Sequence, residues 1–403
     1  MKIIYITPSF QHPKMRGPTR CYHFIKALSL RHEITMLSLE PDKIEPTAMQ
    51  EMARYTRDIF TFSTNGASGR DGGFLGNMPV IGRRVRQQSQ YNAGVRAMKK
   101  KFAQLIREQD FDLVLFHGKH VFPVIAECDD LPIVVDFCDA TSMRLRARMQ
   151  YASQKKRLLL RARYLQVRQI EKKLIEKTPH VVFISPRDRE AILGPNDHST
   201  IIPIGVDLNF WIRRTNNPKS NCLVFTGVMN YAPNEDAAKY LLNHILPHIR
   251  HAVPDVEVLI VGRDPSKSLR NIAKNQPGVT VTGFVDDVRD YLEKASVFVA
   301  PLRYGSGVQN KVLEALAMQV PVVATSVAAE GLRMDKTTEP PVCTADGEKR
   351  FAEKVIALLQ NETNRVRLAS EGRAYVEKHF VWSHSAEKLE ALCQTAINGR
   401  NGH

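Results

Sequence analysis

The segment Val299–Met318 contains the residues best suited to chemistry. An apolar run leads into the turn Gly305–Gly307, and a helix predicted to begin at Val308 carries Lys311 and Glu314. A helix N-terminus attracts anions, and Lys311 adds a formal positive charge. Because residues three apart share a helical face, a cation for phosphate lies beside a carboxylate able to bind hydroxyls. The spacing indicates a nucleotide-sugar site; the alternative is a capped helix with two solvated charges.

The elements that must position this turn alternate between strands and helices. In the first half, apolar runs predict strands at Lys2–Thr7, Glu33–Leu39, Phe111–His117, Ile133–Phe137 and Val181–Ser185, with a helix at Thr19–Ser29. Continuous apolar strands between helices are typical of a parallel sheet that is covered on both faces. The Gly-rich tract Asn65–Asn77 lacks a strand–turn–helix setting and is interpreted as a mobile loop.

The second half repeats the pattern. Strands are predicted at Cys222–Thr226, Val256–Val261, Thr280–Thr282, Val297–Ala300 and Val322–Ala324, with helices including Glu235–Arg250, Val288–Lys294 and Gln309–Ala317. The region 205–220 is interpreted as a hinge and linker. We expect two doubly wound, Rossmann-like α/β domains (residues 1–205 and 206–378) followed by a C-terminal helix (379–403), with ligands at the carboxyl ends of the strands.

Positive charge is concentrated in the first half. The 403 residues carry a net charge of +15, of which residues 1–205 contribute +13 (33 Lys and Arg against 20 Asp and Glu). Arg144–Lys173 holds 11 basic residues and one acid. This pattern predicts a basic amphipathic helix that contacts an anionic membrane surface, with an ordinary solvated helix as the alternative. Nucleic-acid binding is a weaker interpretation, because stacking aromatics and known motifs are missing.

Other features favour a cytoplasmic protein that can also bind the inner face of the cytoplasmic membrane. No apolar run is long enough to span a bilayer, and the apolar run Ile3–Ile6 is too short for a signal peptide. The six scattered cysteines form no metal-binding or disulfide pattern.

Four segments resemble glycosyltransferase family 4, whose members have the GT-B fold. They are the hinge-like Ile201–Trp211, the donor-site stretch Gly283–Thr325, and the segments Phe225–Leu242 and Val134–Met149. The last two are most similar to bacterial exopolysaccharide sugar transferases, including those linked to exosortase loci. The resemblance implies two facing domains, a C-terminal helix that crosses back to the first domain, and transfer with retention of configuration.

The resemblance also implies donor-side roles. Glu314 matches the family's ribose-binding glutamate, whereas Ser306 stands where a first glutamate is usual, so the identity of the sugar is open. The backbone at Phe284 and Val285 is similar to the segment beside the nucleotide base. The family's Arg and Lys for the leaving diphosphate are absent from residues 227–234. Lys311 is the first substitute and Arg263 the second, because developing negative charge must be stabilised.

On the acceptor side, a strand end places His117 where a family histidine contacts the transferred sugar. Gly17, Thr19 and Arg20 match the family's glycine-rich loop, with Thr19 as a candidate N-cap. Asp136 and Asp139 follow another strand end. Structural roles remain open for all of these residues: a core histidine, a solvated arginine, and aspartates that cap a turn.

We expect no metal and no cofactor beyond the donor, which is a nucleoside diphosphate sugar of the UDP or GDP type. The one Asp-x-Asp sequence, Asp110–Asp112, precedes its strand and so lies at the wrong end of the sheet. The predicted function is a retaining glycosyltransferase that acts on a lipid-linked glycan in bacterial polysaccharide synthesis. A nucleotide-sugar epimerase, a phosphorylase and a non-catalytic sugar- or membrane-binding protein are the alternatives.

Overall fold

The computed structural model describes residues 1–13, 15, 19–40, 43–64, 80–195, 197, 199–215, 219–305, 307–334 and 338–401. For residues 80–90 and 400–401 the description covers the backbone only. The Gly-rich tract, Gly17 and Ser306 lie outside the described residues.

The first domain is built on a parallel sheet with strand order β3-β2-β1-β4-β5-β6-β7. Its strands are β1 Lys2–Thr7, β2 Glu33–Glu40, β3 Asp58–Ser63, β4 Leu113–His117, β5 Ile133–Cys138, β6 Val181–Phe183 and β7 Thr200–Ile201. The predicted strands are present with small shifts at their ends. β3 and β7 were not predicted: β3 is only half-buried along most of its length, and β7 has only two residues.

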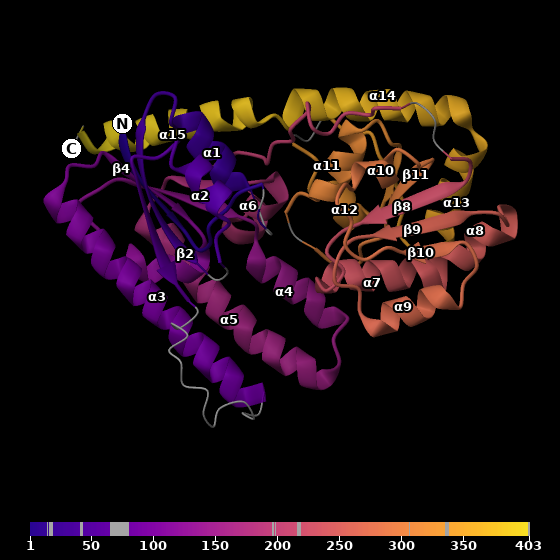
Figure 1. Ribbon diagram of the computed structural model, residues 1–403, viewed down its shortest axis with the longest axis horizontal. Helices are drawn as coiled ribbons and strands as arrows, with labels where there is room; N and C mark the ends of the chain where they lie inside the picture. Colours follow the sequence, from indigo (N-terminus) through magenta and orange to yellow (C-terminus); the bar gives the residue numbers. More distant parts are fainter. Residues whose placement is uncertain are drawn as a thin grey trace.

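The second domain is built on another parallel sheet, with order β10-β9-β8-β11-β12-β13. Its strands are β8 Cys222–Thr226, β9 Glu257–Val261, β10 Val279–Val281, β11 Val297–Ala300, β12 Val322–Ala324 and β13 Cys343–Thr344. Parallel pairing throughout both sheets confirms the predicted pair of Rossmann-like domains (Figure 1).

Helices cover the sheets. Those of the first domain are α1 Arg20–Leu28, α2 Pro46–Met52, α3 Val80–Glu108, a 3₁₀ helix Lys119–Val124, α4 Thr141–Gln150, α5 Gln154–Lys177 and α6 Pro186–Leu193. The second domain has α7 Ala232–Tyr240, a π-helical turn Leu241–Ile245, α8 Leu246–Ala252, α9 Lys267–Lys274, α10 Arg289–Leu292, α11 Asn310–Ala317, α12 Ser326–Glu330, α13 Glu348–Gln360 and α14 Glu362–His379. The single helix predicted at Glu235–Arg250 is therefore three consecutive helical segments.

The last helix, α15 (Trp382–Asn401), crosses back to the first domain as the resemblance implied. Figure 1 shows α14 and α15 following one another along one side of both domains. Leu389 and Cys393 of α15 are fully buried in the core of the first domain. Trp382 packs against both domain cores, stacks on His23 at 4.2 Å between ring centres, and meets Phe24 edge to face. Trp382 therefore anchors the start of α15 between the two domains.

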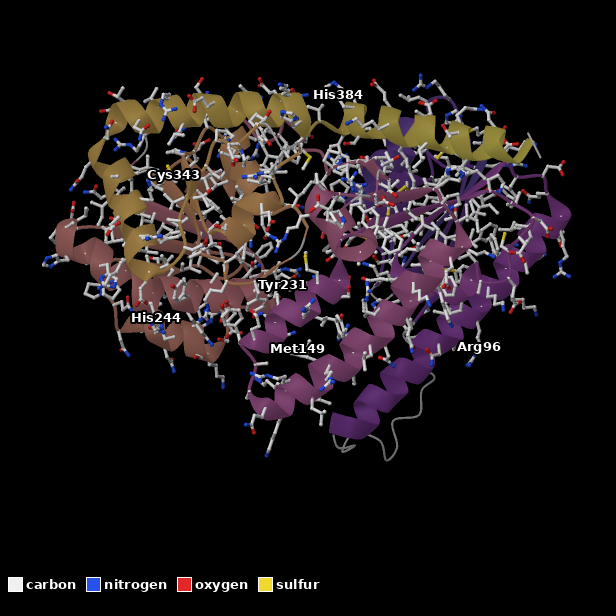
Figure 2. The ribbon with its side chains drawn as sticks, turned by 180° about the vertical axis from the view of Figure 1, so that it is seen from behind. Arg96, Met149, Tyr231, His244, Cys343 and His384 are labelled. Atoms are coloured by element: carbon white, nitrogen blue, oxygen red, sulfur yellow. The ribbon has the colours of Figure 1, made fainter. Side chains whose placement is uncertain are left out.

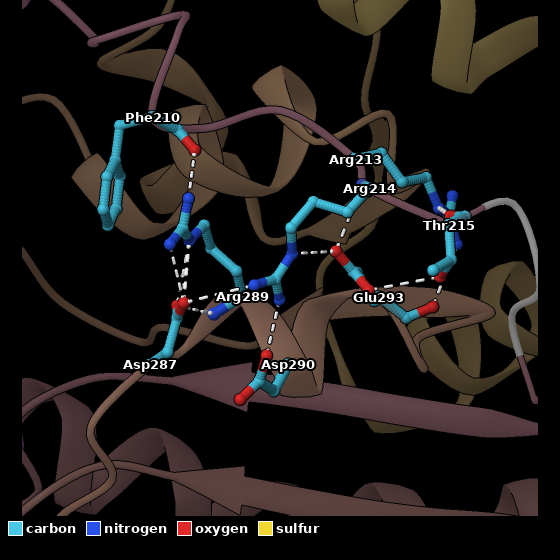
Figure 3. A network of polar contacts seen from close by, with 8 residues as sticks. All are labelled: Phe210, Arg213, Arg214, Thr215, Asp287, Arg289, Asp290 and Glu293. Carbon is cyan, nitrogen blue, oxygen red and sulfur yellow. Dashed lines mark hydrogen bonds and ion pairs between the residues drawn. The ribbon is translucent and has the colours of Figure 1, made fainter.

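The linker after the hinge is tied to the second domain by an arginine network (Figure 3). Arg214 Nε donates to Glu293 Oε1 at 2.7 Å, and Arg213 donates to the Glu293 carbonyl oxygen at 3.1 Å. Arg289 donates to the Phe210 carbonyl oxygen at 2.9 Å and lies 3.9 Å from the centre of the Phe210 ring. Residues 210–214 are therefore attached to the second domain, and the hinge expected in the region 205–220 stays a prediction.

The basic segment Arg144–Lys173 is not one helix. Tyr151–Ser153 separate α4 from α5, and the predicted basic helix corresponds to α5, on which Val167 and Leu174 are buried while Arg161, Arg163 and Arg168 are exposed. Figure 2 shows α4 (Met149 labelled) reaching the second domain near Tyr231, and the Tyr151 ring stacks on Tyr304 of that domain at 5.6 Å. A contact between domains therefore coincides with the break.

Candidate functional site

The carboxyl ends of β8, β9 and β10 converge at three glycines. Gly262 has φ 145°, and a Cβ atom built on it would lie 1.8 Å from the carbonyl oxygen of Gly227. Gly283 forms an isolated bridge with Gly262. Only glycine permits such close backbone approach. The carboxyl ends of these strands therefore present backbone without side chains, on the same sheet edge as the predicted donor turn.

Lys311 lies at this surface and does not point into bulk solvent. It occupies the first turn of α11, whose N-cap residue Gln309 makes no side-chain cap. The Lys311 side chain is half-buried, its Nζ donates to Asn234 Oδ1, and Nζ lies 5.1 Å from the centre of the Phe225 ring. Burial lowers the pKa of Lys311 to about 8, partly offset by Glu314.

Glu314 shares this environment. It is half-buried one turn along α11, and burial raises its pKa to about 7, an effect that the nearby Lys311 partly offsets. Each group partly offsets the effect of burial on the pKa of the other. A cation and a carboxyl group are therefore presented together on one helical face, as predicted from their spacing.

The Gly305–Gly307 turn departs from expectation in one respect. The N–H of Gly307 is not free for phosphate: it donates to Asp188 Oδ1 of the first domain at 3.2 Å. Asp188 is completely buried and also accepts from the N–H of Ala140 at 2.9 Å and from Ser185 Oγ. Burial raises the pKa of Asp188, and these hydrogen bonds partly offset the effect. α11 also begins at Asn310, two residues after the predicted start.

The other predicted donor-side residues also follow strand ends. Arg263 comes after β9, is half-buried and lies 4.0 Å from Asp264. Its carbonyl oxygen accepts from the N–H of Met229, which ties the β8 and β9 loops together. Phe284 follows β10 and is 69% exposed, whereas Val285 is half-buried against the core. An exposed ring at this edge is available for stacking on a base.

In the first domain, the structure brings three predicted residues into one buried cluster. Asp136 Oδ2 accepts from Arg20 Nε at 2.7 Å and lies 3.3 Å from His117 Nδ1. Arg20 also donates to the carbonyl oxygens of Ile202 and Pro203, both at 2.9 Å. Arg20, His117 and Asp136 are each less than 10% exposed, so Arg20 does not face solvent.

The charges in this cluster stabilise each other. Burial disfavours the Asp136 carboxylate, but Arg20 and His117 outweigh it and hold the pKa of Asp136 well below its usual range. Burial also disfavours the His117 imidazolium, yet attraction to Cys21 and Asp136 raises the pKa of His117 to about 10. The carboxyl ends of β4 and β5 therefore present a buried, positively charged imidazole.

Lys119 fixes the loop that follows β5 and was missed at the sequence level. Its Nζ donates to Thr141 Oγ1 at 3.0 Å and to the carbonyl oxygen of Asp139, and lies 3.6 Å from the buried Glu171. Asp139 also lies 3.6 Å from Arg144. The sequence does contain one indication of this role, because Lys119 lies two residues after His117, just beyond the end of a predicted strand.

Two further predictions have structural outcomes. Thr19 occupies the N-cap of α1, but its side chain makes no capping hydrogen bond. Asp112 accepts from the N–H of Lys2 at 2.7 Å, at the amino-terminal ends of β1 and β4. A surface hollow of about 520 Å³ lies at this same end, lined by Met1 and Asp112 among others. Because ligands of parallel sheets gather at the opposite end, the hollow is not the candidate site.

The described part of the chain contains no group of three or more His, Cys, Asp or Glu side chains arranged to hold a metal ion. All six cysteines are free. Metal independence stays a prediction.

The two domains meet through polar contacts at the site. Besides Gly307–Asp188, Arg144 donates to Tyr231 Oη at 2.7 Å, and Arg187 donates to the Val327 carbonyl oxygen at 3.1 Å. The Arg20–His117–Asp136 cluster lies on the first domain and Lys311 on the second, and Gly307 of the second domain contacts Asp188 of the first. The arrangement can hold an anionic group from one side and a polar molecule from the other.

Comparisons with known proteins agree with this geometry. Residues 220–361 match the family described as Glycosyl transferases group 1. A Corynebacterium glutamicum protein described as "GDP-mannose-dependent monoacylated alpha-(1-6)-phosphatidylinositol monomannoside mannosyltransferase" is 30% identical over 160 residues, which are 37% of this chain and 42% of that protein. This chain therefore matches less than half the length of that relative.

Solved structures match nearly the whole chain. Sucrose-phosphate synthase from Thermosynechococcus elongatus aligns with a TM-score of 0.71 at 18% identity, covering 99% of both chains. HepE from Anabaena, in complex with UDP, aligns with a TM-score of 0.64 at 13% identity over 98% of this chain and all of that one. The chain therefore has the fold of the GT-B glycosyltransferases, and its residues 220–361 are similar to the glycosyl transferases group 1 family.

Proposed function

We propose that the protein is a glycosyltransferase that moves a sugar from a nucleoside diphosphate donor to a glycan acceptor. The observation that carries the proposal is the placement of Lys311, which Asn234 holds at the carboxyl ends of the strands of the second domain. The family match and the UDP bound by HepE support a nucleotide donor. A lipid-linked acceptor in polysaccharide synthesis accords with relatives described as phosphatidylinositol-linked and capsular polysaccharide transferases.

Chemically, a departing nucleoside diphosphate concentrates negative charge. Lys311 stabilises that charge as it develops, which is usually the largest contribution to catalysis. Glu314 binds ribose hydroxyls, and Phe284 and Val285 border the base. Arg263 is the second candidate, after Lys311, for binding the phosphates. Gly305 and Ser306, in the turn before α11, contact the sugar or its phosphates.

On the acceptor side, the His117 imidazolium contacts the transferred sugar, oriented by Asp136 and Arg20. Gly17, Thr19 and Asp139 border the acceptor. The reaction proceeds with retention: the leaving phosphate takes the acceptor proton on the same face that the acceptor attacks. No metal is required in this scheme, because Lys311 and the helix N-terminus supply the positive charge. Closure of the domains aligns donor and acceptor.

The test is a thermal-shift panel of nucleoside diphosphates and their sugars, followed by product analysis. A transferase releases free diphosphate only with an acceptor present, whereas an epimerase returns a nucleotide-sugar. Glu314→Ala is expected to weaken donor binding about tenfold or more, because charge-assisted hydrogen bonds to ribose are lost. Donor binding unchanged in Glu314→Ala would favour a non-catalytic sugar-binding protein.

A membrane contact through α5 forms part of the proposal. Leu158, Leu159 and Leu165 are 73%, 71% and 55% exposed, among exposed lysines and arginines of the same helix. Exposed leucines between basic residues are typical of helices that lie in a bilayer interface. In the described part of the chain, no helix has the length and apolar character needed to cross a membrane.

Flotation with anionic vesicles tests this contact. Changing Arg161, Arg163 and Arg168 to Gln is expected to weaken partition roughly hundredfold, at about 1 kcal/mol for each charge. The matched control removes three exposed charges of α13 in the second domain, Lys349, Arg350 and Lys354, and should leave flotation intact. Equal losses in both variants would show that only net charge matters and would reject α5 as the contact.

A further inference from the structure

The side chain of Asn234 is held between the backbone of its own loop and the ammonium group of Lys311. Asn234 lies in the first turn of α7 and is only 5% exposed. Its Nδ2 donates to the Val228 carbonyl oxygen at 3.0 Å, and its Oδ1 accepts from Lys311 Nζ. Because the amide nitrogen is committed to a carbonyl group, the oxygen is the end that faces Lys311.

Gly227 fixes the same amide from another side. A Cβ atom built on Gly227 would lie 2.6 Å from Asn234 Nδ2, so the amide packs directly on the loop backbone. The N–H of Asn234 also donates to the Tyr231 carbonyl oxygen at 2.9 Å. The acceptor for Lys311 is therefore part of a rigid loop end.

An amide oxygen orients an ammonium group without cancelling its charge. A carboxylate at the same point would hold Lys311 equally well but would neutralise it. Among the described residues, Lys311 forms no ion pair within 4.0 Å, and Glu314 acts on it only from a longer distance. An ammonium group has three donors, so two remain for a ligand beside the Asn234 contact.

We infer that Asn234 is a positioning residue that aims the Lys311 ammonium group at the donor diphosphate and leaves its positive charge uncompensated. This inference rests on the proposed function. Asn234 touches neither the sugar nor the base in this scheme; it acts through Lys311.

A double-mutant cycle tests the inference, with the dissociation constants of UDP and GDP measured by calorimetry and kcat and KM measured for turnover. Asn234→Ala is expected to weaken diphosphate binding about 10- to 100-fold, the range for a hydrogen bond to a charged group. Asn234→Asp, which keeps the side-chain volume, is expected to weaken it similarly by neutralising Lys311. In a Lys311→Met background, Asn234→Ala should have no further effect, because the two residues act as a unit.

Asn230→Asp is the matched control. Asn230 lies in the same loop, is exposed and contacts Asp264 rather than Lys311, so diphosphate binding should change less than about twofold. Unchanged or tighter binding in Asn234→Ala and Asn234→Asp would overturn the inference, as would additive losses in the Lys311→Met background. Failure of the wild-type protein to bind any nucleoside diphosphate would instead overturn the proposed function, and the inference with it.

Discussion

Replacing Lys311 with Met is expected to lower kcat about 10²- to 10³-fold, the usual cost of removing one group that stabilises developing negative charge. Met nearly preserves the volume and the packing against Phe225, so loss of the charge is the main change. KM for the donor should rise less than kcat falls, because the charge on the diphosphate is greatest as the bond to the sugar breaks. Steady-state kinetics with the donor found in the thermal-shift panel provides the measurement.

The control for this variant is Lys274→Met on α9, which removes an exposed charge from the same domain. Its kcat should stay within about twofold of the wild type. Lys311→Arg should recover part of the activity, because a guanidinium keeps the charge but has a different shape. Full activity in Lys311→Met would remove Lys311 from the catalytic scheme.

Replacing Asp136 with Asn is expected to lower the free energy of unfolding by about 3–5 kcal/mol, because buried Arg20 and His117 lose their counter-charge. The 2.7 Å contact with Arg20 Nε becomes a contact with a neutral amide. Urea denaturation followed by circular dichroism provides the measurement. Asp130→Asn, at an exposed site in the same domain, is the control and should change stability by less than about 0.5 kcal/mol.

The effect of Asp136→Asn should depend on pH in a defined way. The pKa of His117 is raised from 6.5 to about 10 on folding, so its contribution is complete below pH 6.5 and is lost as the pH rises toward 10. The pKa of Asp136 is lowered from 3.8, so its contribution is present above that value and is lost as the pH falls. The stability difference between the wild type and Asp136→Asn should be greatest between about pH 4 and 6.5. A difference that is constant from pH 5 to 10 would contradict the His117–Asp136 coupling.

Strands could be predicted from the sequence where complete burial requires a continuous run of apolar residues. Strands such as Lys2–Thr7, Cys222–Thr226 and Val297–Ala300 are fully or almost fully buried, so their apolar runs locate them directly. β3 is half-buried at the edge of its sheet, which hides it among less apolar residues. The break between α4 and α5 is associated with a contact to Tyr304 in the other domain, which no local pattern reveals.

The candidate site, like the fold, could be predicted from the sequence only in part. His117 and Asp136 at strand ends, and Arg20 at the start of the helix that follows β1, could be proposed because the topology of a parallel sheet gathers such positions at one edge. Asp188 and Asn234 could not, since their partners Gly307 and Lys311 are 119 and 77 residues away. Sequence spacing also could not show that the N–H of Gly307 is already used by a carboxylate.

Calorimetric comparison of nucleoside diphosphate with nucleoside monophosphate binding, in wild-type protein and Lys311→Met, tests the central claim most directly. The claim is that Lys311 binds the outer phosphate of the departing diphosphate. It predicts that the wild type prefers the diphosphate by about tenfold or more, and that Lys311→Met binds both nucleotides equally, with monophosphate affinity unchanged. A Lys311→Met protein that keeps the wild-type preference for the diphosphate would contradict it.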